Sequence, residues 1–452
     1  MLIALLALFS LLIAYVLHHV LSHQTLLLKQ IFSQTIFNTI QLARLIGPLD
    51  PYDPLTVPDP AIHDSNSASE ISEAQARANQ RIDDARSIID FSYAGPKVEL
   101  EDRLRLRALA NSRLVAAFGI NTSLTSSSVS VHKKFRKLAS ASINKSRADW
   151  QKLYGVCMDF LQREKARYGR TGIGLAECVR CLCFVVVLVS QFGADDKKVD
   201  KNLVKRITDE INAQWLKSKE DGGAVKTSDS LNHDLGMLFG NLKTSVAEEN
   251  GTGKDTYIDP SEALGLIMPQ YETLWRVVLL TYVTAYYRQF DKRSLKKRVK
   301  DIPSCLGNAA TEKEALKLAM EGLRLYPSNN SIYRAATGPG PLKSADVQAC
   351  HRDFNVWGRD ALEFRPERFD NLTPLQEKAY FPFSLGSHKC PAFGGFGNRM
   401  VTMLVVSMGR ALSPEAGKLN FKDAQLDNHV GISLPTGRDE MENWSWDMVR
   451  VQ

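Results

Sequence analysis

The chain has 452 residues, which is enough for one large domain or for two or three smaller ones. Its 57 Lys and Arg residues exceed its 50 Asp and Glu residues by seven, and so small a basic excess gives no indication of nucleic acid as a partner. The seven cysteines are odd in number and scattered, which excludes a disulfide framework of the secreted type and favours a reducing compartment.

The N-terminal segment 1–22 is predicted to be a transmembrane anchor. Residues 2–21 contain no Asp, Glu, Lys or Arg, and about 20 apolar residues are needed for a helix to cross a bilayer. A cleavable signal peptide would have a positive n-region and a small-residue cleavage site, and neither is clear here. Lys29 and Arg44 follow the apolar run, so the positive-inside rule places the rest of the chain in the cytosol.

The remainder is predicted to be a connector over 23–68, with a proline-rich hinge, and a main domain over 69–452. This domain is expected to be largely helical, because helical spacing or helix-length apolar runs recur along it, at 69–91, 148–169 and 175–193. Strand-like pieces are few and short, chiefly 331–336 and 429–435.

The run 175–193 is nearly wholly apolar and is expected in a core. It contains Cys178, Cys181 and Cys183, which could suggest a metal site. No histidine or second cysteine pair lies at zinc-like spacing, and cysteine ordinarily behaves as a small buried hydrophobe. We therefore expect these three thiols to be core residues.

The chemistry is concentrated in the loop FPFSLGSHKCPAFGG, residues 381–395. Cys390 in such a loop could be a nucleophile, a zinc ligand or an axial haem ligand. Zinc would need three further ligands, and only His388 is near; a nucleophile would need a base and an oxyanion hole, and neither is visible. The spacing of Phe383, Gly386 and Cys390 instead predicts a tight turn and a helix start, where peptide N–H groups depress the pKa of the thiol. This suits a thiolate bound to iron.

The loop resembles the cysteine loop of the cytochrome P450 family, the haem-thiolate monooxygenases. Two other stretches match that family's motifs in the right order. Glu321 and Arg324, in EGLR, match its Glu-x-x-Arg helix, and RPERF, residues 365–369, matches its Pro-Glu-Arg-Phe segment. Glu321 and Arg324 share one helix face, so Glu321 can bridge Arg324 and Arg368 in a buried network. By resemblance this network holds the haem loop from behind.

The resemblance implies a mainly α fold with small β-sheets, in which the main domain is a haem-thiolate catalytic domain preceded by the transmembrane helix. The cofactor would be haem b, whose iron is bound by Cys390. Between residues 61 and 110 the sequence reads as helical and charged, which departs from the small β-region that the family has there.

The distal helix of the family is expected within 262–290, where Glu272 and Thr273 match its acid–alcohol pair. Thr273 would position dioxygen and a water by hydrogen bonds, and Glu272 would help to deliver protons. Pro269 and Gln270 stand where the family commonly has small residues. A proline inside a helix frees a carbonyl and favours a kink.

The haem propionates would need donors, and four candidates match by position. His388 replaces the arginine that the family usually has two residues before the cysteine. Arg334 matches a basic residue on a strand under the haem, and His132 with Arg136 aligns with a Trp-x-x-x-Arg pair.

The resemblance implies a monooxygenase that takes electrons from NADPH through NADPH–cytochrome P450 reductase and acts on a lipophilic small molecule. The basic residues Lys133, Lys134, Lys137 and Lys389 would steer an acidic reductase. The alternative is a haem-thiolate isomerase or dehydratase that needs no reductase. The expected location is the endoplasmic reticulum membrane, and the sequence style is similar to that of fungal members that tailor secondary metabolites.

Overall fold

The computed structural model describes residues 68–220, 225–250, 259–288, 306, 308–429 and 431–449. The chain divides into two units, Met1–Ser67 and Ala68–Gln452. The first unit, with the predicted anchor and connector, lies outside the described residues. The second begins one residue before the predicted start of the main domain.

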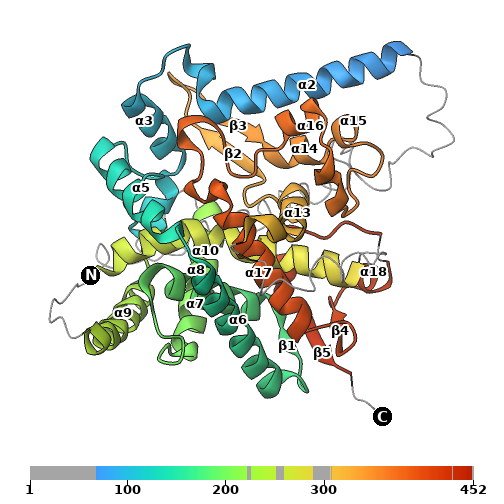
Figure 1. Ribbon diagram of the computed structural model, residues 1–452. Helices are drawn as coiled ribbons and strands as arrows, with labels where there is room; N and C mark the ends of the chain where they lie inside the picture. Colours follow the sequence, from blue (N-terminus) through green and yellow to red (C-terminus); the bar gives the residue numbers. More distant parts are fainter. Residues whose placement is uncertain are drawn as a thin grey trace, which may run out of the picture. The chain divides into compact units, whose positions relative to one another are not determined.

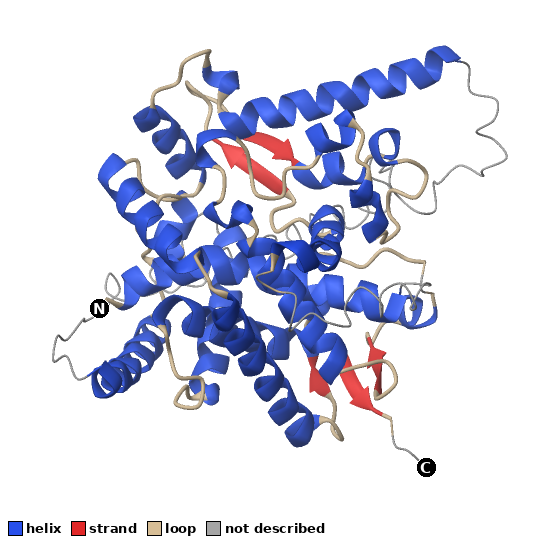
Figure 2. Cartoon of the chain, viewed as in Figure 1, coloured by secondary structure: helices blue, strands red, loops and turns tan. Residues whose placement is uncertain are grey.

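The helices of the second unit lie mostly in its first three quarters, and its strands are short (Figures 1 and 2). The α-helices are α2 (Ala68–Asp90), α3 (Leu100–Ala110), α4 (Ser112–Phe118), α5 (Val129–Ile143), α6 (Arg147–Tyr168), α7 (Leu175–Phe192), α8 (Lys201–Glu220), α9 (Asp229–Asn250), α10 (Pro260–Val283), α13 (Ala309–Leu325), α14 (Val347–Arg352), α15 (Phe354–Trp357), α16 (Pro374–Ala379), α17 (Phe396–Ala411) and α18 (Ala424–Asn428). The short 3₁₀ and π segments are η3 (Ser92–Ala94), η4 (Thr284–Arg288), η5 (Pro366–Asp370), η6 (Gly386–His388), η7 (Pro391–Gly394) and η8 (Asp439–Met441). The strands are β1 (Ile173–Gly174), β2 (Ser331–Arg334), β3 (Lys343–Asp346), β4 (Gly417–Asn420) and β5 (Ser445–Met448).

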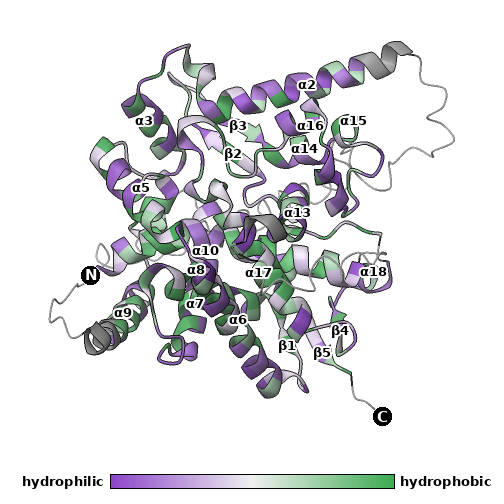
Figure 3. Cartoon of the chain, in the orientation of Figure 1, coloured by the Kyte–Doolittle hydropathy of each residue, from purple (hydrophilic) through white to green (hydrophobic). Residues whose placement is uncertain are grey.

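The core is built around α7, α10 and α17. Helix α10 packs against both α7 and α17, and α6 contacts the same two partners. The hydropathy colouring shows green, apolar faces turned toward one another in this group (Figure 3). Helix α7 is long and apolar enough to cross a membrane, but most of it is buried inside the protein. Its three cysteines are buried as predicted, and no cluster of metal-binding side chains exists among the described residues.

Two small antiparallel sheets complete the unit. One has the strand order β1-β5-β4, and the other pairs β2 with β3, so that Ser331 lies opposite Asp346. The strand expected at 331–336 is therefore confirmed as β2. The strand expected at 429–435 is wrong, because the described part of that segment is a turn and irregular chain. Leu434, one of its alternating apolar residues, is buried in the core although it belongs to a loop.

A second hydrophobic cluster lies where α2 crosses the β2–β3 sheet (Figure 1). Apolar residues at helical spacing on α2, among them Ala78, Ile82 and Ile89, are buried there against residues of β3, α14 and α15. No strand occurs between residues 68 and 172, so the helical interpretation of 69–110 is confirmed. In this unit the β2–β3 sheet is covered by α2 and contacted by α3.

Candidate active site

The cysteine loop has the tight turn that its spacing predicts. Gly386 has φ +63°, a left-handed conformation that favours glycine, and a Cβ there would lie 3.3 Å from Asp90. The backbone N–H of Cys390 donates to the carbonyl of Phe383 over 2.8 Å, which closes the loop. Cys390 then precedes the 3₁₀ segment η7, and α17 begins at Phe396. The cysteine thus stands at the start of a helical run.

The thiol of Cys390 is partly enclosed by protein. Its side chain is accessible to solvent, yet burial raises the pKa of the thiol. The N–H of Ala392 and the charges of Arg107 and Arg136 act in the opposite direction, but burial outweighs them. The expectation that the loop alone depresses this pKa is therefore wrong, because desolvation of the thiolate raises the pKa more than these donors and charges lower it.

Two arginines from distant parts of the chain lie beside the loop. The guanidinium of Arg107, on α3, lies 3.3 Å from Nδ1 of His388. Arg334, on β2, is buried, stacks over the ring of Phe91 at 4.7 Å and donates to the carbonyl of Tyr333. Burial lowers the pKa of Arg107 to about 9 and that of Arg334 to about 10. Both guanidinium groups are therefore partly desolvated.

The α5 pair, His132 and Arg136, also reaches the loop. Arg136 donates to the carbonyl of Ser387 over 3.4 Å. His132 is buried, its Nδ1 lies 2.6 Å from Oγ of Ser123, and its ring packs edge-on against that of His388 at 5.5 Å. Burial, together with the charges of Arg107 and neighbouring basic groups, lowers the pKa of His388 to about 3. The imidazole of His388 is therefore neutral across the physiological pH range.

The basic side chains beside the loop suit a cofactor that carries two negative charges on one edge. Nε of Arg334 and Nε2 of His388 are buried and have no hydrogen-bond partner. Within the described residues, no carboxylate forms an ion pair with Arg107, Arg136 or Arg334. Buried charges without counter-ions and buried donors without acceptors destabilise a folded protein unless a bound ligand pairs with them. The two propionates of haem would do so, with the iron at Cys390.

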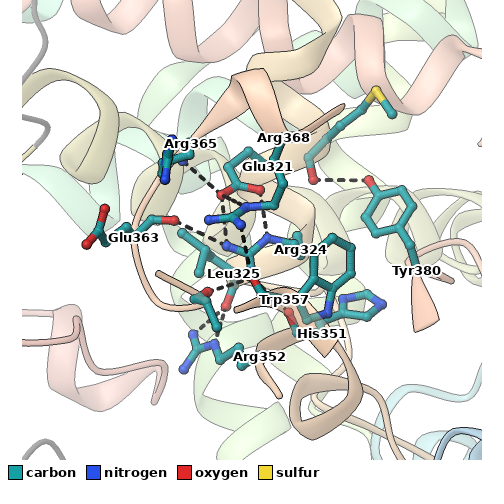
Figure 4. Close-up of polar contacts among 12 residues, drawn as sticks. Glu321, Arg324, Leu325, His351, Arg352, Trp357, Glu363, Arg365, Arg368 and Tyr380 are labelled. Carbon is teal, nitrogen blue, oxygen red and sulfur yellow. Dashed lines mark hydrogen bonds and ion pairs between the residues drawn. The ribbon is translucent and has the colours of Figure 1, made fainter. Parts of the chain in front are cut away.

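The Glu321–Arg324 pair is fully buried behind this region (Figure 4). Arg324 donates from Nε and from a terminal nitrogen to the two oxygens of Glu321, over 2.7 and 2.8 Å. Its other donors reach the carbonyls of His351, Ala361 and Glu363, and its guanidinium stacks over the ring of Trp357. The predicted pairing on one helix face is confirmed. The three carbonyl groups that Arg324 binds all lie outside α13.

Arg368 joins the network, although its bond to Glu321 is its weakest. Its Nε lies 3.5 Å from the Glu321 carboxylate, while its terminal nitrogens donate to the carbonyls of Trp357 and Asp360 and to the Asp360 carboxylate. The backbone N–H of Arg365 also donates to Glu321, over 2.9 Å. The sequence did not indicate Asp360, because it belongs to none of the motifs.

His351 is a further buried member of this region. Its Nε2 accepts from the N–H of Phe381 over 3.1 Å, its ring packs against that of Tyr380, and its carbonyl accepts from Arg324 (Figure 4). Burial and the nearby Arg324 charge lower the pKa of His351 to about 3. The imidazole is therefore neutral in the folded protein across the physiological range.

This neutrality predicts a pH dependence of stability. Below about pH 6.5 the unfolded chain takes up a proton at this histidine while the folded protein does not, so stability falls as the pH falls, by up to about 1.4 kcal/mol per pH unit. In His351→Gln, whose amide oxygen can replace Nε2 as the acceptor, urea midpoints at pH 7 and pH 5 should differ less than in the parent protein. His429→Gln, at an exposed position, should keep the parent's difference. An unchanged pH dependence in His351→Gln would contradict the assignment.

Glu272 and Thr273 occupy α10, which continues through Pro269 without ending. The Thr273 hydroxyl donates to the Pro269 carbonyl over 2.7 Å. Glu272 is buried and forms an ion pair with Arg438, while its other oxygen, Oε1, has no hydrogen-bond partner. The structure therefore makes Glu272 an internal charge, and Arg438 is a partner that no motif indicated.

The chain is similar in sequence to several known cytochromes P450. The chain is 26% identical over 229 residues to bifunctional cytochrome P450/NADPH–P450 reductase 1 of Bacillus subtilis, an alignment that covers 42% of this chain and 21% of that protein. It is 28% identical over 225 residues to echinocystic acid 23-monooxygenase of Saponaria officinalis, covering 44% and 42%. The family model described as Cytochrome P450 matches residues 344–403, which include the loop and Arg368. Over this segment the chain therefore matches the cytochrome P450 family.

The match to the P450 family implies haem bound through a cysteine thiolate, and Cys390 lies within the matched segment. A cytochrome P450 monooxygenase of the fungus Emericella nidulans, apdE, is 42% identical over 53 residues, covering 12% of this chain and 10% of that protein. The aligned parts span only 10% to 42% of the length of the curated P450 relatives.

Proposed function

We propose that this P450 is a haem-thiolate monooxygenase. The observation that carries the proposal is the convergence of Arg107 and Arg136 on Cys390, because neither forms an ion pair with a carboxylate among the described residues. When bound, the haem activates dioxygen, so that one oxygen atom enters the substrate and the other becomes water, with both electrons supplied by NADPH. The substrate is a lipophilic small molecule, and the reaction is a hydroxylation, an epoxidation or a related oxidation.

On the proximal side the chain supplies binding and rigidity. Cys390 supplies the thiolate, with the Ala392 N–H as a donor to its sulfur. Arg107, Arg334 and His388 would hold the propionates through donors that are now without partners or only weakly paired. Behind them, the Glu321–Arg324 pair fixes the chain that leads into the loop.

On the distal side the chain handles water and protons. The Thr273 hydroxyl donates its proton to the Pro269 carbonyl, so its oxygen is oriented to accept a hydrogen bond from water. Oε1 of Glu272 is the one carboxylate oxygen there without a partner, and it can hold a proton while Oε2 keeps its pairing with Arg438. Thr273 and Glu272 would thus deliver protons from solvent to the reacting oxygen.

The alternative is an isomerase or dehydratase that rearranges its substrate without reductase. The Glu272–Thr273 pair favours the monooxygenase, because a rearrangement needs no proton delivery. NADPH oxidation measured with a candidate substrate, a P450 reductase and dioxygen separates the two. Oxidation should depend on all three and should yield an oxygenated product, whereas product formed without reductase would support the alternative.

We also propose an endoplasmic reticulum location, with a single-pass anchor and a cytosolic P450 domain. The apolar segment 2–21 and the free cysteines support this proposal. A role in fungal secondary metabolism is supported by the similarity to apdE over 53 residues. The reductase fused to the Bacillus relative belongs to that protein, and a separate reductase is proposed for this chain.

A basic face on α5 is proposed to dock the reductase. Lys133 and Lys137 are exposed there, and Lys134, also exposed, pairs with Glu262 at 2.6 Å. Replacing Lys133 and Lys137 by Glu should lower reductase-supported turnover several-fold at low ionic strength and much less at about 0.5 M salt, because screening removes the steering. Lys418→Glu, an exposed charge reversal on β4, should leave turnover unchanged. Equal turnover in the double variant and the control at low salt would contradict the proposal.

A further inference from the structure

A second cluster of positive charge lies beside the distal part of α10. Arg113 on α4 and Arg438 near the C-terminus both stack on the ring of Trp215 on α8, with the guanidinium carbons 4.7 and 4.6 Å from its centroid. Arg438 also lies over the ring of Trp275 and pairs with Glu272 on α10. Four segments that are distant in sequence therefore meet around one indole ring.

Two more cations belong to this cluster. Arg276, one turn along α10 from Glu272, donates to the carbonyls of Ser328 and Thr436, and its Nε is buried without a partner. Lys219, at the end of α8, is exposed, and it has no hydrogen bond or ion pair among the described residues. Arg113 donates to the neighbouring Ser218 hydroxyl over 2.5 Å. The cluster thus combines buried cations with cations that solvent can reach.

The charges in this cluster do not balance. Burial, followed by the charge of Arg438, lowers the pKa of Arg113 and of Lys219, and burial and Arg438 lower that of Arg276 to about 10. In each case Glu272 is the one carboxylate that acts in the opposite direction. Glu272 is already paired with Arg438, so three cations remain without a counter-charge. Like charges held together in a partly desolvated place are destabilising, and such arrangements concentrate at binding sites.

We propose that this cluster binds the anionic group of the substrate, so that the substrate class is a lipophilic molecule carrying a carboxylate. This rests on the proposed monooxygenase function and specifies its substrate. Arg113 and Lys219 supply the accessible donors, and a carboxylate matches a guanidinium and an ammonium through charge-assisted hydrogen bonds. Trp215 and Trp275 supply apolar faces beside the charges. Glu272 and Thr273 are neighbours on α10, so the same helix would hold the anionic group next to the residues proposed for proton delivery.

The test compares a matched pair of probes, dodecanoate and 1-dodecanol, on the full-length holoenzyme. Dissociation constants are measured by equilibrium dialysis, which needs no turnover. Dodecanoate should bind about tenfold or more tightly than dodecanol, since one charge-assisted hydrogen bond contributes more than about 1.4 kcal/mol. In Arg113→Gln and Lys219→Gln the affinity for dodecanoate should fall about tenfold, while that for dodecanol stays the same. Lys217→Gln, an exposed lysine on the same helix, should change neither.

A second readout concerns stability. Lys219→Gln removes a repelled charge that has no partner, so it should raise the urea midpoint slightly, although it weakens binding. Equal affinities for the two probes in the parent protein, absence of saturable dodecanoate binding, or an unchanged preference in both variants would overturn the proposal. Failure of the monooxygenase function would give a different result. NADPH oxidation would then be independent of substrate, while dodecanoate would still bind more tightly than dodecanol in dialysis.

Discussion

Glu321→Gln is expected to destabilise the protein by about 3–5 kcal/mol, because it leaves the buried charge of Arg324 without its counter-ion. Both side chains are 0% exposed, so water cannot replace the lost carboxylate. Glutamine has the same shape, but it presents one acceptor oxygen where Arg324 and the Arg365 N–H use two. Urea unfolding followed by circular dichroism should show a large drop in midpoint and weaker haem retention.

Glu363→Gln provides the matched control for this variant. The Glu363 side chain is exposed, and only its backbone carbonyl accepts from Arg324 (Figure 4). Its free energy of unfolding in urea should stay within about 0.5 kcal/mol of the parent value. If Glu321→Gln were as stable as Glu363→Gln, the network would not hold the structure in the way described.

Arg438→Leu is expected to cost about 3 kcal/mol or more at neutral pH, because the buried carboxylate of Glu272 loses its ion pair. Urea unfolding of the parent and of the variant at neutral pH measures the difference.

The double variant Glu272→Leu/Arg438→Leu separates the loss of charge balance from the loss of packing. Removing both members of a buried pair often costs little when the replacements fill the space. We therefore expect the double variant to recover most of the stability that Arg438→Leu loses. A double variant less stable than the single one would show that the ion pair is not what Arg438 contributes.

The sequence predicted those parts of the site whose geometry is local. Glu321 and Arg324 are three residues apart on a helix, so their pairing follows from helical spacing. The turn at Gly386 and its link to Cys390 lie within one short loop. The main helices were likewise predicted, because their apolar runs are long and periodic.

The rest depends on contacts between distant segments, which spacing does not encode. Arg107 meets His388 across 281 residues of sequence, and Arg438 meets Glu272 across 166. Arg107 lies in a helix with several arginines, so nothing local distinguishes it from a solvated charge. The low pKa of His388 could not be predicted for the same reason, because it follows from burial and from cations on α3 and β2.

The strand predicted at 429–435 failed through a similar ambiguity. A short apolar alternation fits either a half-buried strand or a loop that inserts single side chains into the core. Here Leu434 is buried from irregular chain, and the strands lie on either side, as β4 and β5. Partner strands decide between the two outcomes, and they are distant in sequence.

The central claim is that Cys390 binds haem iron as a thiolate. The most direct measurement is the difference spectrum of the purified, reduced protein with carbon monoxide, taken in parallel on Cys390→Ala and on the matched control Cys181→Ala, whose cysteine is buried on α7. The parent and Cys181→Ala should both show the red-shifted Soret band of a thiolate ligand, and Cys390→Ala should lack it. A parent protein without this band, or a Cys390→Ala variant that keeps it, would contradict the claim.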